Sequence, residues 1–279
     1  MSVLKETKFI MNKYHIIANK NLGQNFLVDD EIVLGIVNVA NITKNDLVIE
    51  IGPGLGTLTR ELLERAGKVT CIELDKRIIQ ILQDRFSMYS NFEIINNDVL
   101  KVNLKEIIKK ANLPNVKIVA NLPYYITTPI IMKLLEERLD IQTITVMIQK
   151  EVADRLVTEP GTGDTGAITY AINYYSEPKR VLEVPNTAFI PEPKVNSSVI
   201  QLKILKETKV KAEDEEKLFE LIKIAFMQKR KTLVNVLANS NRYGAKEQIE
   251  QALTKLKIDP KIRPEKLTLE QFSELSKIL

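Results

Sequence analysis

The segment 121–124, Asn-Leu-Pro-Tyr, carries groups suited to chemistry on a flat ring that bears an amino group. Such a nitrogen is a poor nucleophile because its lone pair is delocalised into the ring, so an enzyme must hold it with well-placed hydrogen-bond acceptors. The Asn121 side-chain oxygen and the Pro123 carbonyl can each accept one amino hydrogen, and the Tyr124 ring can stack on an extruded base. An ordinary turn after a strand would use the same residue types. Asn121, Pro123 and Tyr124 are therefore candidate catalytic residues.

A glycine-rich turn, Gly-Pro-Gly-Leu-Gly at 52–56, lies between an apolar run and a helix-periodic segment. Glycines let the backbone approach a ligand, and the following helix presents unpaired N–H groups. The turn therefore predicts a nucleotide-like ligand at Gly52 and Gly54, although a tight strand-to-helix turn also needs glycine for its own geometry. Thr57 breaks the dinucleotide fingerprint, which disfavours NAD, and the chain contains no G-x-x-x-x-G-K-[ST] cradle for a triphosphate.

Two acidic residues follow the next two apolar runs. Glu73 comes twenty-one residues after Gly52, where a carboxylate can bind both hydroxyls of a ribose. Asp98 follows the third run and would face the same crevice. Either residue alone is also typical of a helix cap or a solvent-exposed strand end. Together with the glycine turn they favour an adenosyl group, and S-adenosylmethionine fits this set better than ATP.

The elements that must position these residues alternate along the chain, which predicts an α/β fold with a doubly wound parallel sheet. The expected strands are 47–51, 69–74, 92–95, 117–120 and 143–148, with helices at 31–40, 57–65, 76–86 and 128–138 and late β-type runs at 181–184 and 197–205. Beyond residue 206 the pattern becomes helical, with a capping box at Thr268. We expect a catalytic domain over 1–206, beginning with a basic, unpatterned leader, and a small all-α domain over 207–279.

Composition excludes several classes of function. With one His and one Cys among 279 residues, neither a His/Cys zinc cage nor an internal disulfide can form, so no metal is expected. Cys71 lies in an apolar run and is expected to be buried and inert. No apolar run reaches the roughly 18 residues of a membrane span, and the first residues lack a signal-peptide pattern, which predicts a soluble, cytoplasmic protein without a membrane partner.

The positive charge is concentrated near the C-terminus. Residues 1–205 contain 24 basic and 24 acidic residues, whereas residues 206–279 contain 16 and 12. The leader adds a second basic end, with four Lys and one Glu in residues 1–20. Lys and Arg provide most of the sequence-independent affinity for nucleic acids. This distribution therefore suits a protein with a neutral central part whose two basic ends bind a polyanion. Lys229, Arg230 and Lys231 are the candidate phosphate contacts.

Several ordered segments resemble the ribosomal RNA adenine N6-dimethyltransferase family, over nearly the whole chain from about residue 19 onward. They are 21–27 (Asn-Leu-Gly-Gln-Asn-Phe-Leu), 50–56 with the glycine turn, Glu73, Asn97-Asp98, the 121–124 tetrad and 189–198 (Phe-Ile-Pro-Glu-Pro-Lys-Val-Asn-Ser-Ser). The resemblance implies a Rossmann-like class I S-adenosylmethionine-dependent methyltransferase sheet. It also implies S-adenosylmethionine as the methyl donor and the addition of two methyl groups to adenosine N6.

The same resemblance implies roles for individual residues. Its cofactor contacts map onto Asn25, Leu27, Gly52, Glu73, Asp98 and Asn121. Phe189 would close the second face of the target base and form a sandwich with Tyr124. The alternative for Phe189 is a core side chain beside a rigid Pro-x-Pro turn.

Within the family, the likeness is greatest to the branch that dimethylates two adjacent adenosines in a hairpin near the 3′ end of small-subunit (16S) ribosomal RNA. Leu122, segment 149–155 and the basic segment 226–233 favour that branch over the macrolide-resistance branch, which modifies large-subunit RNA. The implied partner is the small ribosomal subunit during its biogenesis, and no obligate protein partner is expected. A ribosome-assembly checkpoint that acts mainly by binding, and a DNA adenine methyltransferase, stay open as alternatives.

Overall fold

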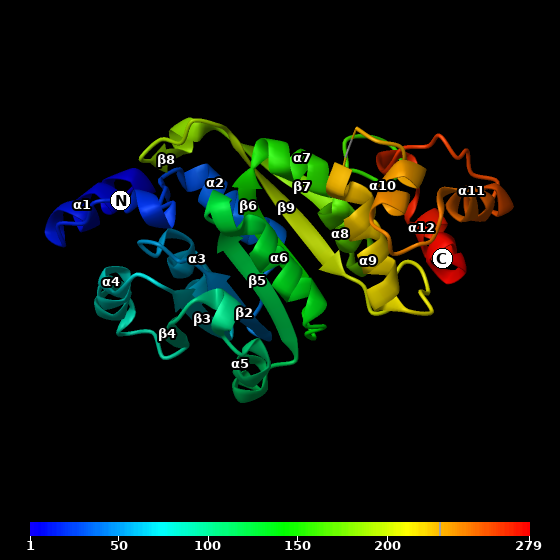
Figure 1. The fold of residues 1–279 in the computed structure, drawn as a ribbon. Helices are drawn as coiled ribbons and strands as arrows, with labels where there is room; N and C mark the ends of the chain where they lie inside the picture. The colour runs from blue at the N-terminus through cyan, green and yellow to red at the C-terminus, as the bar shows by residue number, and fades with distance from the viewer. Residues whose placement is uncertain (229) are drawn as a thin grey trace. The chain divides into compact units, whose positions relative to one another are not determined.

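The larger sheet of the protein has seven strands in the order β4-β3-β2-β5-β6-β9-β7. The computed structural model describes residues 1–228 and 230–279. The parallel strands are β2 (Asp46–Ile51), β3 (Lys68–Glu73), β4 (Phe92–Asn96), β5 (Asn115–Asn121) and β6 (Thr143–Gln149). β9 (Ser197–Ile204) pairs antiparallel with β6, and β7 (Ser176–Val184) forms the far edge. The predicted doubly wound α/β fold is confirmed (Figure 1).

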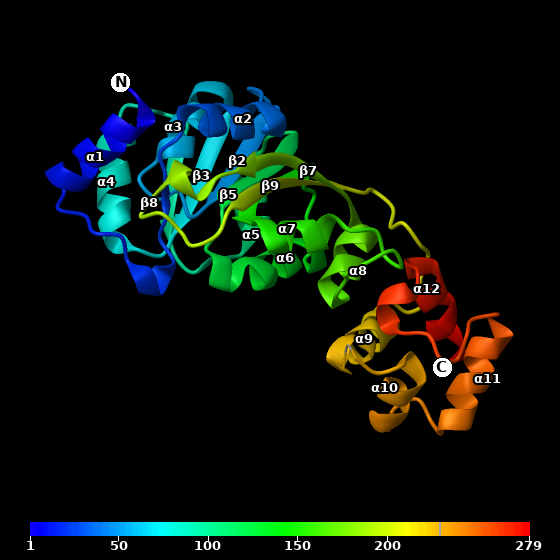
Figure 2. The same ribbon diagram turned by 90° about the horizontal axis from the view of Figure 1, so that it is seen from above.

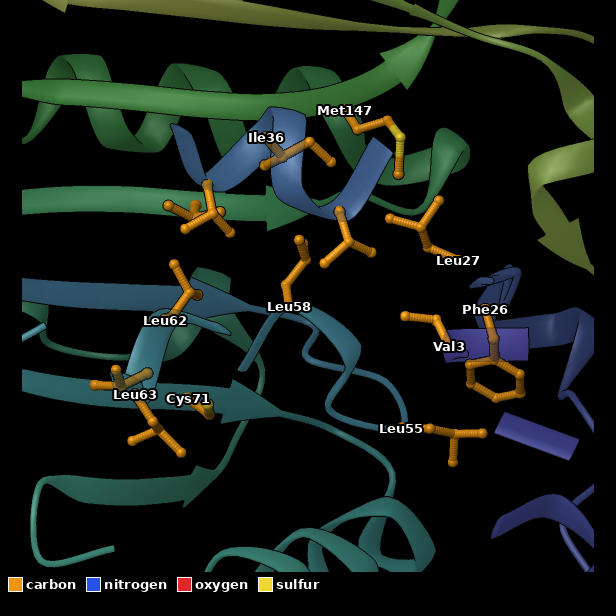
Figure 3. Close-up of a cluster of buried hydrophobic side chains, with 14 of the residues drawn as sticks. Val3, Phe26, Leu27, Ile36, Leu55, Leu58, Leu62, Leu63, Cys71 and Met147 are labelled. Atoms are coloured by element: carbon orange, nitrogen blue, oxygen red, sulfur yellow. The ribbon is translucent and has the colours of Figure 1, made fainter. Parts of the chain in front are cut away.

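Helices cover both faces of this sheet. They are α2 (Asp30–Ala40), α3 (Thr57–Arg65), α4 (Lys76–Phe86), α5 (Leu104–Ala111) and α6 (Thr127–Glu136). Figure 2 shows α2 and α3 on one side of the parallel strands and α6 on the other. Ile36 of α2 meets Leu58 and Leu62 of α3 over the strands, and Cys71 of β3 is fully buried beneath them (Figure 3). Burial on both faces explains why the central strands β2, β3, β5 and β6 appear as nearly continuous apolar runs in the sequence.

The N-terminal leader contains a helix, α1 (Val3–Lys13), so its description as unpatterned is wrong. The Ser2 hydroxyl caps this helix, and Val3, Thr7 and Ile10 are its buried residues. This inner face has only two aliphatic side chains, which is why hydrophobic periodicity did not reveal the helix. Glu6 pairs with Arg60 of α3 and Arg85 of α4, which fastens α1 to the helices that cover the sheet.

A short two-stranded ribbon lies outside the large sheet. β1 (Phe26–Leu27) pairs antiparallel with β8 (Phe189–Ile190), with Leu27 opposite Phe189. The ribbon therefore brings two of the family-like segments together, although they are far apart in the sequence.

The chain divides into two compact units that interleave along the sequence. The first comprises residues 1–153 and 179–204, and the second comprises residues 154–178 and 205–279. The sequence pattern predicts that residues 154–178 belong with the first 206 residues, whereas in the structure they belong with the C-terminal helices. The physical reason is α8 (Ala167–Tyr175), whose Tyr170 is fully buried and donates its hydroxyl to the Leu267 carbonyl at 2.7 Å.

The second unit is helical apart from the first residues of β7. Besides α8 and the end of α7 (Lys150–Val157), it contains α9 (Glu215–Ala225), α10 (Leu233–Asn239), α11 (Lys246–Lys255) and α12 (Leu269–Ile278). Tyr170 packs edge-on against Phe272 of α12, and Thr268 caps that helix as its capping box predicts. Within the described parts of both units, no helix is long and apolar enough to cross a membrane.

Candidate active site

The carboxyl ends of β2, β3, β4 and β5 open into one pocket of the first unit. Segments that precede and follow these strands complete its wall. Most of the residues predicted from the sequence line this pocket together: Asn25, Leu27, Gly52, Gly54, Glu73, Asp98, Asn121, Pro123 and Tyr124. The fold thus brings the residues predicted to bind an adenosyl group and the 121–124 segment to one pocket.

The glycines of the turn serve different purposes. A Cβ on Gly56 would lie 2.6 Å from the Phe86 ring, and the residue has φ +83°, so this glycine is required by packing. Gly52 has φ +67°, and the nearest atom to its ideal Cβ is the Asn121 carbonyl oxygen at 3.9 Å. The backbone at Gly52 is therefore open to the pocket, as a site for close approach of a ligand requires.

Glu73 ends β3 with its carboxylate held in place by the backbone. The Leu74 and Asp75 amides donate to Glu73 Oε1 at 2.8 and 2.9 Å. Burial raises the pKa of this carboxyl above its ordinary value, while these backbone hydrogen bonds oppose the shift. The side chain is thus pre-oriented at the pocket wall, which suits recognition of vicinal hydroxyls.

Asp98 both caps a short helix and lines the pocket. Its Oδ1 accepts from the Leu100 amide at 3.0 Å, at the start of η2 (Val99–Lys101). The capping and ligand-binding interpretations of Asp98 are therefore compatible with each other.

Asn121 is the last residue of β5. Its Nδ2 donates to the Asn25 carbonyl at 3.2 Å. This bond restrains the side-chain amide, and Oδ1 accepts no hydrogen bond from the described residues.

The Pro123 carbonyl differs from the sequence expectation. It accepts hydrogen bonds from the Ile126 amide and from Thr127 Oγ1, both at 3.2 Å, because the chain turns into η3 (Tyr124–Ile126) at this point. Both lone pairs are therefore occupied. The neighbouring Leu122 lines the same pocket, and its carbonyl accepts no hydrogen bond from the described residues. The sequence could not distinguish the two carbonyls, since the choice depends on the conformation of the turn.

Tyr124 is half-buried at the pocket, and its hydroxyl lies 2.8 Å from Ser197 Oγ. Burial raises the pKa of the phenol above its ordinary value, so the hydroxyl is neutral at physiological pH.

Phe189 lies apart from the other candidates. Its side chain is only 3% exposed and belongs to the apolar cluster that includes Val184 and Leu27. It does not line the pocket, and in this arrangement its ring is not accessible to a base. Pairing of β8 with β1 places the Phe189 backbone opposite Leu27. Leu27 lines the pocket, whereas the Phe189 ring is buried in the apolar cluster.

The pocket also has an apolar wall that the motifs in the sequence did not indicate. Leu74, which is 51% exposed, directly follows Glu73, and Val99 directly follows Asp98. Tyr125 is 62% exposed at the same pocket. An apolar residue immediately after an acid at a strand end is the signal that could have identified Leu74 and Val99.

Glu50 of β2 lies at the buried end of the pocket. It is 1% exposed, and its Oε2 accepts from Thr59 Oγ1 at 2.6 Å and contacts the Cys71 thiol at 3.4 Å. Burial raises the pKa of Glu50 to about 7. Because the ordinary value is 4.5, the folded protein keeps a proton that the unfolded chain loses, and the free energy of unfolding falls as the pH rises between these values.

Replacing Glu50 by glutamine is expected to stabilise the unliganded protein at pH 8 and to have little effect at pH 5. Each displaced pKa unit corresponds to about 1.4 kcal/mol. After subtraction of the cost of burying an amide, the expected gain at pH 8 is on the order of 2 kcal/mol. Thermal unfolding midpoints across this pH range test the prediction. Parallel pH profiles for both proteins would contradict it.

Of the candidate phosphate contacts, Arg230 and Lys231 lie between η5 (Phe226–Gln228) and α10 and are exposed. Neither side chain forms an ion pair with another described residue. Lys229 lies outside the described residues.

Comparison with known proteins gives consistent matches along the chain. A family model described as ribosomal RNA adenine dimethylase matches residues 16–279. The chain is 48% identical over 274 residues to the "ribosomal RNA small subunit methyltransferase A" of Alkaliphilus oremlandii, covering 98% of this chain and 95% of that protein. It is 49% identical over 278 residues to the protein of the same name from Lachnoclostridium phytofermentans, covering 99% and 96% of the two chains.

Two solved structures share the architecture at 27% identity. A dimethyladenosine transferase from Plasmodium falciparum matches with a TM-score of 0.75, covering 90% of this chain and 95% of the other. The 23S rRNA methyltransferase ErmE matches with a TM-score of 0.70, covering 91% and 99% of the two chains.

Proposed function

The chain belongs to the ribosomal RNA adenine dimethylase family, and from this premise we propose that it uses S-adenosylmethionine to dimethylate N6 of two adjacent adenosines near the 3′ end of 16S ribosomal RNA. The single observation that carries the proposal is the pocket in which Glu73 and Asp98 share one cavity with Asn121. A methyl donor and a target amino group can meet there.

Sequence identity separates the two ribosomal branches better than fold does. TM-scores of 0.75 and 0.70 rank a dimethyladenosine transferase and a 23S enzyme almost equally. In contrast, relatives that are 48% and 49% identical are named as small-subunit methyltransferases. This difference supports the small subunit, assembled in the cytoplasm, as the partner of the chain.

Bound S-adenosylmethionine supplies an electrophilic methyl group. We assign its ribose hydroxyls to Glu73 and its adenine ring to the apolar wall at Leu74 and Val99, with Asp98 available for the exocyclic amine. The open backbone at Gly52 would accommodate the amino-acid part. Two features fit such a ligand. The Glu73 carboxylate is held in place by two backbone amides, and the space beside Gly52 is free of other protein atoms to 3.9 Å.

At the other end of the pocket, Asn121 Oδ1 would accept one hydrogen of the target amino group. The Leu122 carbonyl is the better second acceptor, because the Pro123 carbonyl already accepts two hydrogen bonds. The Tyr124 ring would stack on the adenine. Together these contacts would orient the nitrogen lone pair toward the methyl group.

The direct test is transfer of labelled methyl groups from S-adenosylmethionine to small subunits that lack the modification, followed by mapping of the labelled nucleotides. Label on two adjacent adenosines of 16S ribosomal RNA is the expected result. Label on large-subunit RNA or on DNA would overturn the proposal. A strain with a folded but inactive variant tests the checkpoint alternative. If binding is the main role, small subunits should assemble normally in this strain although they are not methylated.

Neutralising Lys229, Arg230 and Lys231 together to glutamine is expected to weaken binding to unmethylated small subunits. The slope of log affinity against log salt should fall by roughly 0.7 to 0.9 for each phosphate contact that is lost. Cofactor binding should not change. The measurement is binding across a range of potassium chloride concentrations.

A matched control replaces Lys255, Lys257 and Lys261, which are also exposed in the second unit, and changes the net charge equally. If the two triple variants have the same slope, general charge rather than the 229–231 cluster accounts for binding.

A further inference from the structure

The segment 189–198 resembles the family along its whole length, yet the proposed function assigns a role to none of its residues. Ser197 is the first residue of β9, and it is fully buried. Its register opposite Gln149 of β6 is set by the antiparallel ladder, so its position depends on the central sheet. Ser197 Oγ lies 2.8 Å from the Tyr124 hydroxyl.

We infer that Ser197 is a positioning residue that holds the Tyr124 ring in the place where it can stack on the target adenine. This inference rests on the proposed function, in which Tyr124 contacts the base. Tyr124 belongs to the three-residue η3, so local secondary structure restrains its ring weakly. A hydrogen bond to the phenol oxygen fixes where the far end of the ring lies and so restrains the first side-chain torsion, and the central sheet supplies the partner.

The adjacent Ser198 provides an internal comparison. It is also fully buried in β9, but its hydroxyl has no hydrogen-bond partner among the described residues. Ser197→Ala and Ser198→Ala therefore remove the same atom at neighbouring buried positions of one strand. Only the first change removes a bond to Tyr124.

The experiment compares Ser197→Ala, Ser198→Ala, Tyr124→Phe and the double variant Ser197→Ala/Tyr124→Phe in the full-length protein. The readouts are kcat, the KM for unmethylated small subunits and the Kd for S-adenosylhomocysteine. We expect Ser197→Ala to lower kcat roughly five- to tenfold with the cofactor Kd unchanged, because one buried hydrogen bond is lost. Ser198→Ala should stay within about twofold of the wild-type kcat.

A double-mutant cycle separates positioning from general damage. If the two hydroxyls act only through each other, Tyr124→Phe should match Ser197→Ala, and the double variant should be no slower than either single variant. Equal kcat values for the two serine variants, or effects that multiply in the double variant, would overturn the inference. Asn121→Ala in the same assay tests the proposed function separately, since an active Asn121→Ala would refute the catalytic set itself.

Discussion

Replacing Asn121 by alanine is expected to reduce methyl transfer by about 100- to 1000-fold while the fold stays intact. The change removes the Oδ1 acceptor that would orient the target nitrogen, and loss of one preorganised polar group in an active site costs about 3 to 4 kcal/mol in the barrier. It also removes the bond from Nδ2 to the Asn25 carbonyl, but it takes away no core volume because Asn121 is only partly buried. Single-turnover methylation of unmodified small subunits measures the effect.

The control for Asn121→Ala is the thermal unfolding midpoint together with affinity for the small subunit. Both should remain close to wild type. Turnover within about threefold of wild type would show that Asn121 has no part in the chemistry, and the assignment of the tetrad would fail with it.

Replacing Glu73 is expected to weaken cofactor binding specifically. A carboxylate that binds two ribose hydroxyls forms charge-assisted hydrogen bonds, and their loss costs about 1.5 to 3 kcal/mol, or roughly 10- to 150-fold in Kd. Glu73→Ala also removes the acceptor for the Leu74 and Asp75 amides. Glu73→Gln is therefore the sharper variant, because it keeps an acceptor for those amides and removes only the charge.

Calorimetry with S-adenosylhomocysteine tests this prediction, and binding to the small subunit serves as the control. We expect both Glu73 variants to lose cofactor affinity, with the alanine variant losing more. An unchanged Kd for both would exclude Glu73 from the ligand site and would leave the adenosyl assignment without its main polar contact.

The sequence predicted the central fold closely wherever the pattern of apolar residues alone determines the element. The central strands β2, β3, β5 and β6 are buried on both faces, so each appears as an apolar run in the sequence, and α3 and α4 begin and end at the predicted residues. α1 was missed because its docking depends on Glu6 and two arginines that follow much later in the chain, rather than on a continuous apolar stripe.

Most of the pocket residues could also be predicted, because the order of strands along the chain determines which strand ends meet. Polar residues at the ends of parallel strands must converge on one edge of the sheet, which is why Glu73, Asp98 and Asn121 line one pocket. The hydrogen bonds of the Pro123 carbonyl and the burial of Phe189 arise from turn conformation and ribbon pairing. Neither leaves a signature in residue type or spacing.

The interleaving of the two units imposes a delay during chain synthesis. α8 is made well before its partners, because the carbonyl that binds the Tyr170 hydroxyl lies 97 residues further along the chain. A nascent or truncated chain that ends at residue 206 would leave the apolar side chains of α8 without α9 and α12, which cover them in the complete unit. Such exposed surface attracts chaperones and other unfolded chains. The central sheet has received its last strand by Ile204, whereas the helical unit can close only after α12 (Leu269–Ile278) has left the ribosome.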